Sequence, residues 1–427
     1  MKVLFLAHRI PFPPNKGDKI RAFNILRHLT KHHEVYLACL MDDENDLRFL
    51  PQIERLVRRV AFDRIRPRTK KLFALGGMLR SRPITVGYFY STRLQTQIDD
   101  IIEAVNVEAF VCSSSPMAEY LFRSRHADAK IHAGIRVMDL IDVDSCKWRQ
   151  YAEQSPVWTS WIYRYEAEHL AEYEKHIART FDHVLVVSEQ EKGVFPGGGN
   201  APNLEAMSNG VDLEYFKPDP SGTHTPARPT LVFTGAMDYR PNIEGIRWFV
   251  ESVFPRIQIA APDVELLIVG NKPTPEVMRL GRLRGVVVTG FVEDVRKYLA
   301  SASVCVVPLL IARGIQNKVL EAMAMGKAVV CTPQAHEGIR ATSPKELVVA
   351  GNPDDFAAAT IDLLSDQGKA RQLGVAARQR VEREYSWEDK LRLLDRILAA
   401  GKTAERPTGP ALGPGHGAGA ATGVRSA

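Results

Sequence analysis

The chain has 427 residues, of which 45% are hydrophobic and 25% charged, a composition typical of soluble globular proteins. This length exceeds one ordinary core and predicts two domains followed by a tail. The absence of any run of about 18 apolar residues excludes a membrane-spanning helix. The N-terminus "MKVLFLAHRIPFPP" is too short and too quickly interrupted for a secretory signal. We therefore predict a cytoplasmic protein.

The five cysteines show no paired spacing, and four lie in or beside apolar runs such as "VYLACL" and "SVCVVPLL". This pattern indicates reduced core residues rather than a disulfide or zinc framework. The twelve histidines include no HExxH pattern. We predict no metal site and no cofactor.

The net charge of +6 is unevenly distributed along the chain. Residues 54–82 contain ten Lys or Arg against two acids, interleaved with apolar side chains. This composition suits an anionic surface, either a lipid bilayer or a polyanion, and it equally suits a solvated basic helix face. No nucleic-acid-binding motif accompanies the pI of about 9.0, so we do not predict nucleic acid as a partner.

The first half of the chain alternates predicted strands and helices. "KVLFLA" is an apolar run followed by a loop rich in Pro, Gly and Asn, a helical pattern over 18–33 and a second strand, "EVYLACL". This order is a βαβ unit and predicts a parallel sheet. Further strands are predicted at "VEAFVCSSS", "IRVMDLIDVD" and "HVLVV", and Ser188 with Glu191 forms a capping box for the next helix.

One long stretch, 148–180, is helical in period and rich in Trp and Tyr. Aromatic residues at helical spacing indicate core packing. The alternative is a wall that faces an acceptor or a membrane.

The strand and helix pattern restarts after 206–229, a stretch rich in Pro, Gly and Thr that we predict to be the hinge. Predicted strands follow at "TLVFTGAM", "VELLIVG", "GVVVTGF", "VCVVPL" and "KAVVCT". Two doubly wound α/β halves leave a cleft at the carboxyl ends of their strands. We assign domains to 1–205 and 230–385, a final helix to 386–401 and a disordered tail to 402–427.

The loop that enters the helix "NKVLEAMAMG" carries the clearest indication of a site. A loop containing Gly314 at a helix N-terminus exposes amide groups and a positive dipole end, which together hold a phosphate. Lys318 adds a positive charge in the first turn, and Glu321, one turn further, is placed to accept hydrogen bonds from sugar hydroxyls. In the alternative interpretation Gly314 only turns the chain and Glu321 is a surface acid.

Sharper phosphate motifs are absent from the sequence. No G-x-G-x-x-G follows the first strand, and "MAMGKAVV" lacks the leading Gly and the Ser or Thr of a P-loop. These absences argue against a dehydrogenase and against an ATPase.

Five motifs in fixed order resemble the nucleotide-sugar domain of retaining glycosyltransferases of family four, which have the GT-B fold. They are "SNGVDLEYFKP", "LVFTGAM", "LLIVGNKP", "VVVTGFVEDVRKYLASASVCVVPL" and "GIQNKVLEAMAMGKAVVCT". The resemblance runs over 181–390 and more weakly over 1–60. With "LIDVDSCKWRQYA" included, the chain most resembles the exopolysaccharide sugar transferases associated with PEP-CTERM/exosortase systems.

The resemblance implies an α/β GT-B fold, with two doubly wound Rossmann-like domains facing across a cleft. It implies a retaining, metal-independent hexosyltransferase that moves sugar from a nucleoside diphosphate sugar to a lipid-linked or polysaccharide acceptor. The product would be an exopolysaccharide or surface glycan made at the inner face of the cell membrane, which 54–82 would contact. It also implies that the helix at 386–401 crosses back to the first domain.

The strand-end loops and the resemblance together give three groups of candidate site residues, with Gly17, Phe291, Val292 and Glu321 taken from the resemblance. The catalytic candidates are Asp142, Lys318 and Arg240. The donor-binding candidates are Gly17, Gly235, Asn271, Lys272, Phe291, Val292, Gly314, Ile315, Gln316, Asn317 and Glu321, the last matching a ribose-binding Glu. The acceptor-side candidates are His8, Arg9, Asp139 and Asp144.

The sequence departs from the pattern of the family in three regions. Arg313 stands where a Glu is frequent, and Ala236 and Glu244 occupy the region of the usual diphosphate-binding Arg and Lys. The charge for the diphosphate must then come from the other cations, which are Arg240, Lys272, Arg313 and Lys318.

The third departure is at the tip of a first-half strand, where the frequent His is replaced by a group of acids in "MDLIDVDS". An Asp there orients the sugar or the acceptor hydroxyl, or it only caps the strand. Two rival functions stay open on these grounds: a nucleotide-sugar epimerase or phosphorylase of the same fold, and a non-catalytic scaffold.

Overall fold

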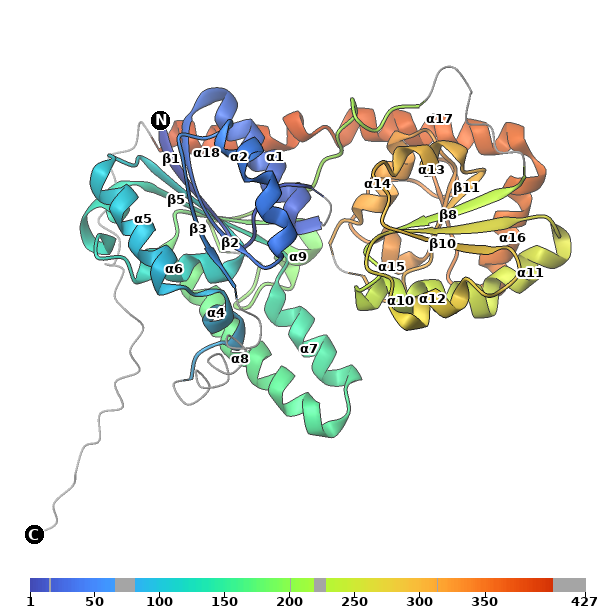
Figure 1. Cartoon of the computed structure of the whole chain (residues 1–427), viewed down its shortest axis with the longest axis horizontal. Helices are drawn as coiled ribbons and strands as arrows, with labels where there is room; N and C mark the ends of the chain where they lie inside the picture. Colours follow the sequence, from blue (N-terminus) through green and yellow to red (C-terminus); the bar gives the residue numbers. More distant parts are fainter. Residues whose placement is uncertain (15–16, 66–80, 200, 219–227, 313, 402–427) are drawn as a thin grey trace, which may run out of the picture.

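The computed structural model describes residues 1–14, 17–65, 81–199, 201–218, 228–312 and 314–401. These residues form two parallel sheets with helices on both faces, one sheet in each half of the chain (Figure 1). The predicted fold class, two doubly wound Rossmann-like α/β domains, is confirmed. Four predicted features lie wholly or partly outside the described residues: 66–80 of the basic segment, 219–227 of the linker, Arg313 and the tail 402–427.

The first domain is built on a sheet in which the described strands run in the order β3-β2-β1-β4-β5-β6-β7. The strands are β1 (Lys2–Ala7), β2 (Glu34–Met41), β3 (Arg59–Arg64), β4 (Ala109–Ser113), β5 (Ile135–Ile141), β6 (His183–Val186) and β7 (Leu204–Ala206). The helices are α1 (Gly17–His32), η1 (Glu44–Phe49), α2 (Leu50–Glu54), α4 (Ile84–Phe89), α5 (Thr92–Ala104), η3 (Ser115–Met117), α6 (Ala118–Phe122), η4 (Ala127–Ile131), α7 (Asp144–Gln154), α8 (Val157–Thr180) and α9 (Glu189–Gly193).

The second domain is built on a parallel sheet in which the described strands run in the order β10-β9-β8-β11-β12-β13. The strands are β8 (Thr230–Thr234), β9 (Glu265–Val269), β10 (Val286–Gly290), β11 (Val304–Val307), β12 (Val329–Cys331) and β13 (Val348–Val349). The helices are α10 (Arg240–Trp248), η5 (Phe249–Val253), α11 (Phe254–Ala260), α12 (Pro275–Leu280), α13 (Arg296–Ser301), α14 (Asn317–Ala324), α15 (Pro333–His336), α16 (Pro353–Ser365), α17 (Gln367–Glu384) and α18 (Trp387–Ala400).

The central strands are buried because helices cover both faces of each sheet. Every residue of β4 and of β8 is buried. Four of the cysteines lie in the buried strands β2, β4, β11 and β12, and all five are free thiols. These four cysteines are therefore core residues, as their apolar surroundings in the sequence predicted, whereas Cys146, in α7, is half-buried.

The stretch predicted as one long helix is two helices, α7 and α8, that form a hairpin. Pro156 ends the helical pattern, because the ring of a proline disfavours helical geometry in the residue before it. Ser155 is accordingly extended, and α8 begins after Pro156. Figure 1 shows this hairpin projecting from the body of the first domain. No described helix is both long and apolar enough to span a bilayer.

The last helix, α18, returns to the first domain after α17 has packed on the second (Figure 1). Trp387 and Leu394 are part of the first domain's core, together with strand residues such as Val137. His28 of α1 contacts Asp395 of α18 at 2.8 Å. The two domains are thus connected twice, once through the stretch after β7 and once through the junction of α17 and α18.

Replacement of Trp387 by Ala should destabilise the first domain by about 3 to 5 kcal/mol, because it leaves a large cavity under α18. Urea unfolding followed by circular dichroism would measure the loss. Trp158→Ala is the matched control, since that side chain is 75% exposed. Equal losses for the two variants would contradict the packing role of Trp387.

Candidate functional site

The two domains meet through loops that follow strands. Nδ2 of Asn209, after β7, donates to Oδ1 of Asn317 at 3.1 Å. Lys272, after β9, pairs with Asp43, after β2, at 3.0 Å. A Cβ on Gly17 would lie 3.9 Å from Nδ2 of Asn317. The predicted glycine loop of the first domain therefore faces the predicted donor loop of the second, at the carboxyl ends of both sheets.

Gly314 makes the tightest of these contacts. Its φ of 62° lies in the left-handed region that favours glycine. A Cβ at this position would lie 2.7 Å from Oδ1 of Asp142 and 2.9 Å from Cγ1 of Val187. Only glycine at this position lets the loop before α14 lie so close to the first domain. Asp142 therefore lies beside this loop.

Lys318 extends from the first turn of α14 toward the loop after β8. Its ammonium group donates a hydrogen bond to Oδ1 of Asn242 and lies 4.8 Å above the ring of Phe233. A Cβ on Gly235 would lie 3.1 Å from Nζ of Lys318, so the glycine leaves room for this side chain. Among the described residues, no carboxylate lies within ion-pair distance of Lys318.

Burial controls the charge of Lys318 and Glu321. It lowers the pKa of Lys318 to about 7, although the Glu321 carboxylate opposes the shift. It raises the pKa of Glu321 to about 7, against the opposing effect of Lys318. Both groups are poorly solvated, so they lose little hydration when they bind the phosphate and hydroxyl groups of a ligand.

Two of the other candidate cations, Arg240 and Lys272, are already paired with carboxylates. Arg240 pairs with Glu244 at 2.7 Å, and its guanidinium lies 6.0 Å from the ring of Tyr151 across the domain boundary. Lys272 pairs with Asp43, a hydrogen bond that raises the pKa of Lys272. Arg313 lies outside the described residues. Lys318 is therefore the cation best placed to receive a diphosphate.

The remaining donor-side candidates differ in exposure. Phe291 is 66% exposed, whereas Val292 packs against the core of the second domain. Ile315 is buried, and Gln316 is the N-cap residue of α14. Asn271 accepts a backbone hydrogen bond from Met237 through its carbonyl, which fixes the loop after β9.

Asp142 lies between β5 and α7, opposite the loop that carries Gly314, and Asp144 is the first residue of α7. Burial, together with the charges of Glu191 and Asp144, raises the pKa of Asp142 to about 7, while Lys147 opposes the shift. Asp144 pairs loosely with Lys147 at 3.8 Å. Burial by itself lowers the pKa of Lys147, but Asp144 and its other anionic neighbours outweigh burial and hold it above the usual range.

His8 and Arg9 follow β1 and hold the start of α1. His8 contacts Asp18 at 3.1 Å, and Arg9 pairs with Asp18 and with Asp42. Burial by itself raises the pKa of Asp18, but the hydrogen bond and charge of His8 and the ion pair with Arg9 hold it well below its usual range. These contacts position Gly17, which directly precedes Asp18.

Asp139 is not an acceptor-side residue, and that prediction was wrong. Its side chain is buried and receives hydrogen bonds from the buried guanidinium of Arg21 at 2.7 to 3.0 Å. Nη1 of the same guanidinium donates to the carbonyl of Met207 and to Oδ1 of Asn209. A carboxylate so enclosed ties β5 to α1 and cannot reach a substrate.

The structure adds residues that the sequence did not single out. Asn242 holds Lys318, and Asn209 joins the domains. Tyr239, after β8, hydrogen-bonds Tyr151 of α7, and burial raises the pKa of Tyr239 to about 12. A strand-end loop position was the only signal in the sequence for Tyr239 and Asn209.

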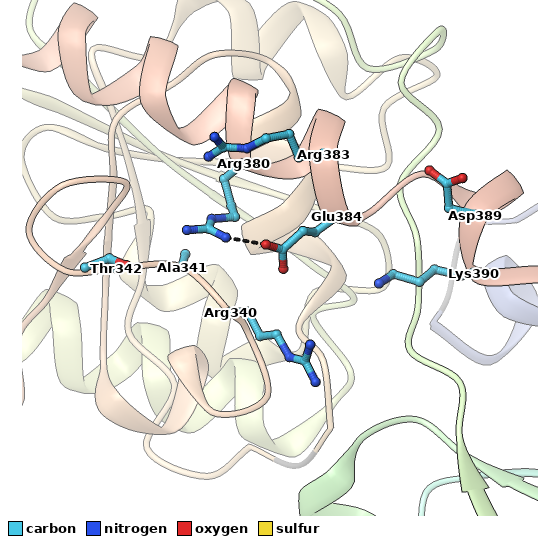
Figure 2. Close-up of a pocket in the computed structure, with 8 residues that line it drawn as sticks. All are labelled: Arg340, Ala341, Thr342, Arg380, Arg383, Glu384, Asp389 and Lys390. Carbon is cyan, nitrogen blue, oxygen red and sulfur yellow. Dashed lines mark hydrogen bonds and ion pairs between the residues drawn. The ribbon is translucent and has the colours of Figure 1, made fainter.

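A cavity of about 580 Å³ lies elsewhere, where α17 passes into α18. Figure 2 shows its charged lining, which is Arg340, Ala341, Thr342, Arg380, Arg383, Glu384, Asp389 and Lys390. None of the predicted site residues lines this cavity. Much of its charge is internally paired, as in the contacts of Arg380 with Glu346 and Glu384.

Comparison with known proteins finds a family match in the second half of the chain. Residues 228–366 match the family described as Glycosyl transferases group 1. The second domain is thus similar to group 1 glycosyltransferase domains over these residues. The matched residues include β8, the loops that carry Gly235 and Lys318, and Glu321.

Curated relatives match this chain at low identity. A GDP-mannose-dependent monoacylated alpha-(1-6)-phosphatidylinositol monomannoside mannosyltransferase of Corynebacterium glutamicum is 28% identical over 228 residues, 47% of this chain and 57% of the relative. The chain thus matches little more than half the length of that enzyme. An uncharacterized 44.6 kDa protein in the cps region of Klebsiella pneumoniae is 20% identical over 90% of this chain and 96% of the relative.

Solved structures share the fold of this chain. Sucrose-phosphate synthase from Thermosynechococcus elongatus superposes with a TM-score of 0.68 at 18% identity, covering 94% of this chain and 100% of that one. HepE from Anabaena, in complex with UDP-glucose, also has a TM-score of 0.68, at 15% identity and the same coverage. These neighbours support the GT-B arrangement of the two domains.

Asp139→Asn should destabilise the first domain by about 3 to 5 kcal/mol, because it leaves the buried charge of Arg21 without its carboxylate. Denaturant unfolding would measure the effect. Asp144→Asn, at a half-buried and loosely paired position, serves as the control and should cost about 1 kcal/mol or less. A stable Asp139→Asn protein would show that the ion pair does not hold β5 and α1 together.

Proposed function

We propose that this protein is a glycosyltransferase that moves a hexose from a nucleoside diphosphate sugar to a lipid-linked or polysaccharide acceptor, with retention of anomeric configuration and without a metal. The observation that carries the proposal is the position of Lys318 and Glu321. They lie on the first turns of α14, behind a glycine loop that contacts the facing domain at Asp142.

In this proposal Lys318 and the amide groups at the start of α14 bind the diphosphate. The negative charge on the leaving diphosphate grows as the sugar departs, and a fixed cation in a poorly solvated site stabilises that charge. Glu321 accepts hydrogen bonds from the ribose hydroxyls. A Cβ on Gly17 would lie 3.9 Å from Nδ2 of Asn317, so the glycine leaves space on the first-domain side of the phosphates.

Asp142 is proposed to orient the acceptor hydroxyl and to accept its proton. It lies beside Gly314 in the first domain, on the side from which an acceptor approaches. Burial raises its pKa to about 7, which suits proton uptake near neutral pH. Asp144 and Lys147, its neighbours at the start of α7, complete the polar surface on the acceptor side.

We further propose a role in exopolysaccharide or surface-glycan biosynthesis at the cytoplasmic face of the cell membrane. The motif resemblance to transferases of PEP-CTERM/exosortase systems supports this role, as does the similarity along nearly the whole chain to a Klebsiella protein described as lying in a cps region. The basic segment 54–82 is proposed to contact anionic lipid.

Calorimetry of the purified protein with GDP-mannose and UDP-glucose, in the presence of EDTA, tests the donor site. One of the two should bind. Lys318→Met should weaken that binding by about ten- to a hundredfold, because a charge-assisted contact is lost. Glu321→Gln should weaken it by about tenfold or more, since a neutral amide replaces the ionised acceptor of two hydroxyls.

Lys345→Met, which removes an exposed lysine of the second domain away from the site, is the control and should bind as the unmodified protein does. Failure of both donors to bind would favour the scaffold interpretation. Donor turnover without any acceptor would favour an epimerase, and phosphate-dependent release of sugar 1-phosphate would favour a phosphorylase.

Donor affinity should be greatest near pH 7 and fall on both sides. Above pH 7 the free protein loses the Lys318 charge, and below pH 7 Glu321 gains a proton and loses its capacity as an acceptor. Each limb should approach about tenfold per pH unit. Calorimetry with a nucleotide sugar, whose diphosphate stays ionised throughout, measures the profile.

Lys318→Met should remove the alkaline limb of this profile, and Glu321→Gln the acid limb. An unmodified protein whose donor affinity is flat from about pH 6 to 8 would show that these two groups do not titrate at the site.

A further inference from the structure

The tip of the α7–α8 hairpin exposes a cluster of large apolar side chains. Val157 is 87% exposed, Trp158 is 75% exposed and Trp161 is 56% exposed. All three lie in the first turns of α8, directly after the break at Pro156. Figure 1 shows this end of the hairpin standing away from both sheets.

The exposure of Trp158 and Trp161 indicates a surface that another molecule covers. Leaving a large apolar side chain in water forgoes about 1.5 to 3 kcal/mol relative to burial. The other aromatic residues of the hairpin are packed: Trp148 lies 5.6 Å from Tyr163 and 5.8 Å from Tyr151, between ring centroids. The aromatic residues near the site thus form a cluster, whereas Trp158 and Trp161 face outward.

The same hairpin connects this tip with the candidate site. Its first helix begins at Asp144, and Tyr151 contacts Tyr239 and Arg240 of the second domain. The eleven residues of α7 span about 16 Å at the helical rise of about 1.5 Å per residue. A surface that holds the tip would therefore lie about 16 Å from Asp144, the residue at which α7 begins next to the candidate site.

A second copy of the chain is a poor occupant for this tip. A stable protein interface buries about 800 Å² on each partner, whereas complete burial of these three side chains supplies at most about 500 Å². A lipid surface requires no such area, and Trp, with its apolar ring and its N–H donor, is enriched where hydrocarbon meets headgroups.

The charges near the tip also favour a lipid surface. Within 148–164, Arg149 and Arg164 are exposed, against one exposed acid, Glu153, and the next exposed acid, Glu168, lies one turn beyond Arg164. Arginine stems extend along apolar surface while their guanidinium groups reach phosphates. The tip thus combines an apolar end with flanking cations, which fits a bilayer that contains anionic phospholipid.

We propose that the tip of the α7–α8 hairpin, with Val157, Trp158 and Trp161, inserts into the headgroup region of an anionic membrane and delivers a lipid-linked acceptor along α7 to Asp142. The membrane contact is independent of catalysis, whereas the delivery of acceptor rests on the proposed function. The hairpin supplies a docking surface in addition to the basic segment 54–82.

The experiment is sedimentation of the full chain with phosphatidylcholine vesicles that contain about 30% phosphatidylglycerol, and with vesicles of phosphatidylcholine alone. The protein should bind the anionic vesicles, and its tryptophan fluorescence should shift to the blue on binding. Trp158→Ser/Trp161→Ser should lower the partition coefficient by about tenfold or more and abolish the shift. Ile259→Ser, at an 84% exposed apolar position of α11, should change neither.

Three results would overturn the proposal. The first is an unmodified protein that does not bind the anionic vesicles. The second is a double variant that binds as well as the unmodified protein, which would place the contact elsewhere, such as in 54–82. The third is an oligomer that the double variant disrupts in sedimentation velocity without vesicles, which would assign the tip to a second copy of the chain.

Nucleotide-sugar binding in the same preparations separates this proposal from the proposed function. The double variant should keep its thermal unfolding midpoint and its donor affinity. It should lose transfer to acceptor embedded in vesicles but keep transfer to a short, water-soluble acceptor. Vesicle binding without any donor binding would reject the proposed function and leave the membrane contact standing.

Discussion

The buried ion pair between Arg21 and Asp139 is the contact on which the arrangement of the first domain depends. The guanidinium of Arg21, on α1, donates hydrogen bonds to the Asp139 carboxylate of β5. It also donates to Met207 and Asn209, just after β7. A buried charge is tolerated only when its hydrogen bonds are satisfied, and here two segments, β5 and the stretch just after β7, supply the acceptors. Asn209, fixed in this way, meets Asn317 of the other domain.

The site exists because the same edge of each sheet faces the other. Parallel strands end together, so the loops after β1, β5 and β7 form one surface, and those after β8, β9 and β11 form another. Gly314 allows these surfaces to touch at Asp142. The double connection through α18 holds the sheets opposite each other, since Trp387 anchors the returning helix in the first domain's core.

Partial burial gives the site its chemistry. Burial shifts the pKa values of Lys318, Glu321 and Asp142 toward 7, the first downward and the other two upward. Groups that are costly to keep charged without a partner bind an opposite charge or a hydroxyl with more free energy than solvated groups do. The α7–α8 hairpin begins at Asp144, beside this site, and exposes Trp158 and Trp161 at its far end. The hairpin thus connects the candidate site to an exposed apolar surface.

The sequence by itself determined the features that depend on near neighbours in the chain. The strands, the α14 pattern and the spacing of Gly314, Lys318 and Glu321 follow from local periodicity, so the fold class and the glycine loop before α14 could be predicted. The break at Pro156 was also local, but the continuous aromatic pattern on either side concealed it.

Only the tertiary structure decided which polar groups meet. Arg21 and Asp139 are 118 positions apart, and Lys272 and Asp43 are 229 apart, so no sequence spacing pairs them. The first pair removes Asp139 from the candidate site, and the second neutralises Lys272, so that among the described candidate cations Lys318 is the one without a carboxylate partner. Burial and charge pairing depend on the folded structure rather than on sequence position, and they distinguish Lys318 from Asp139 and Lys272.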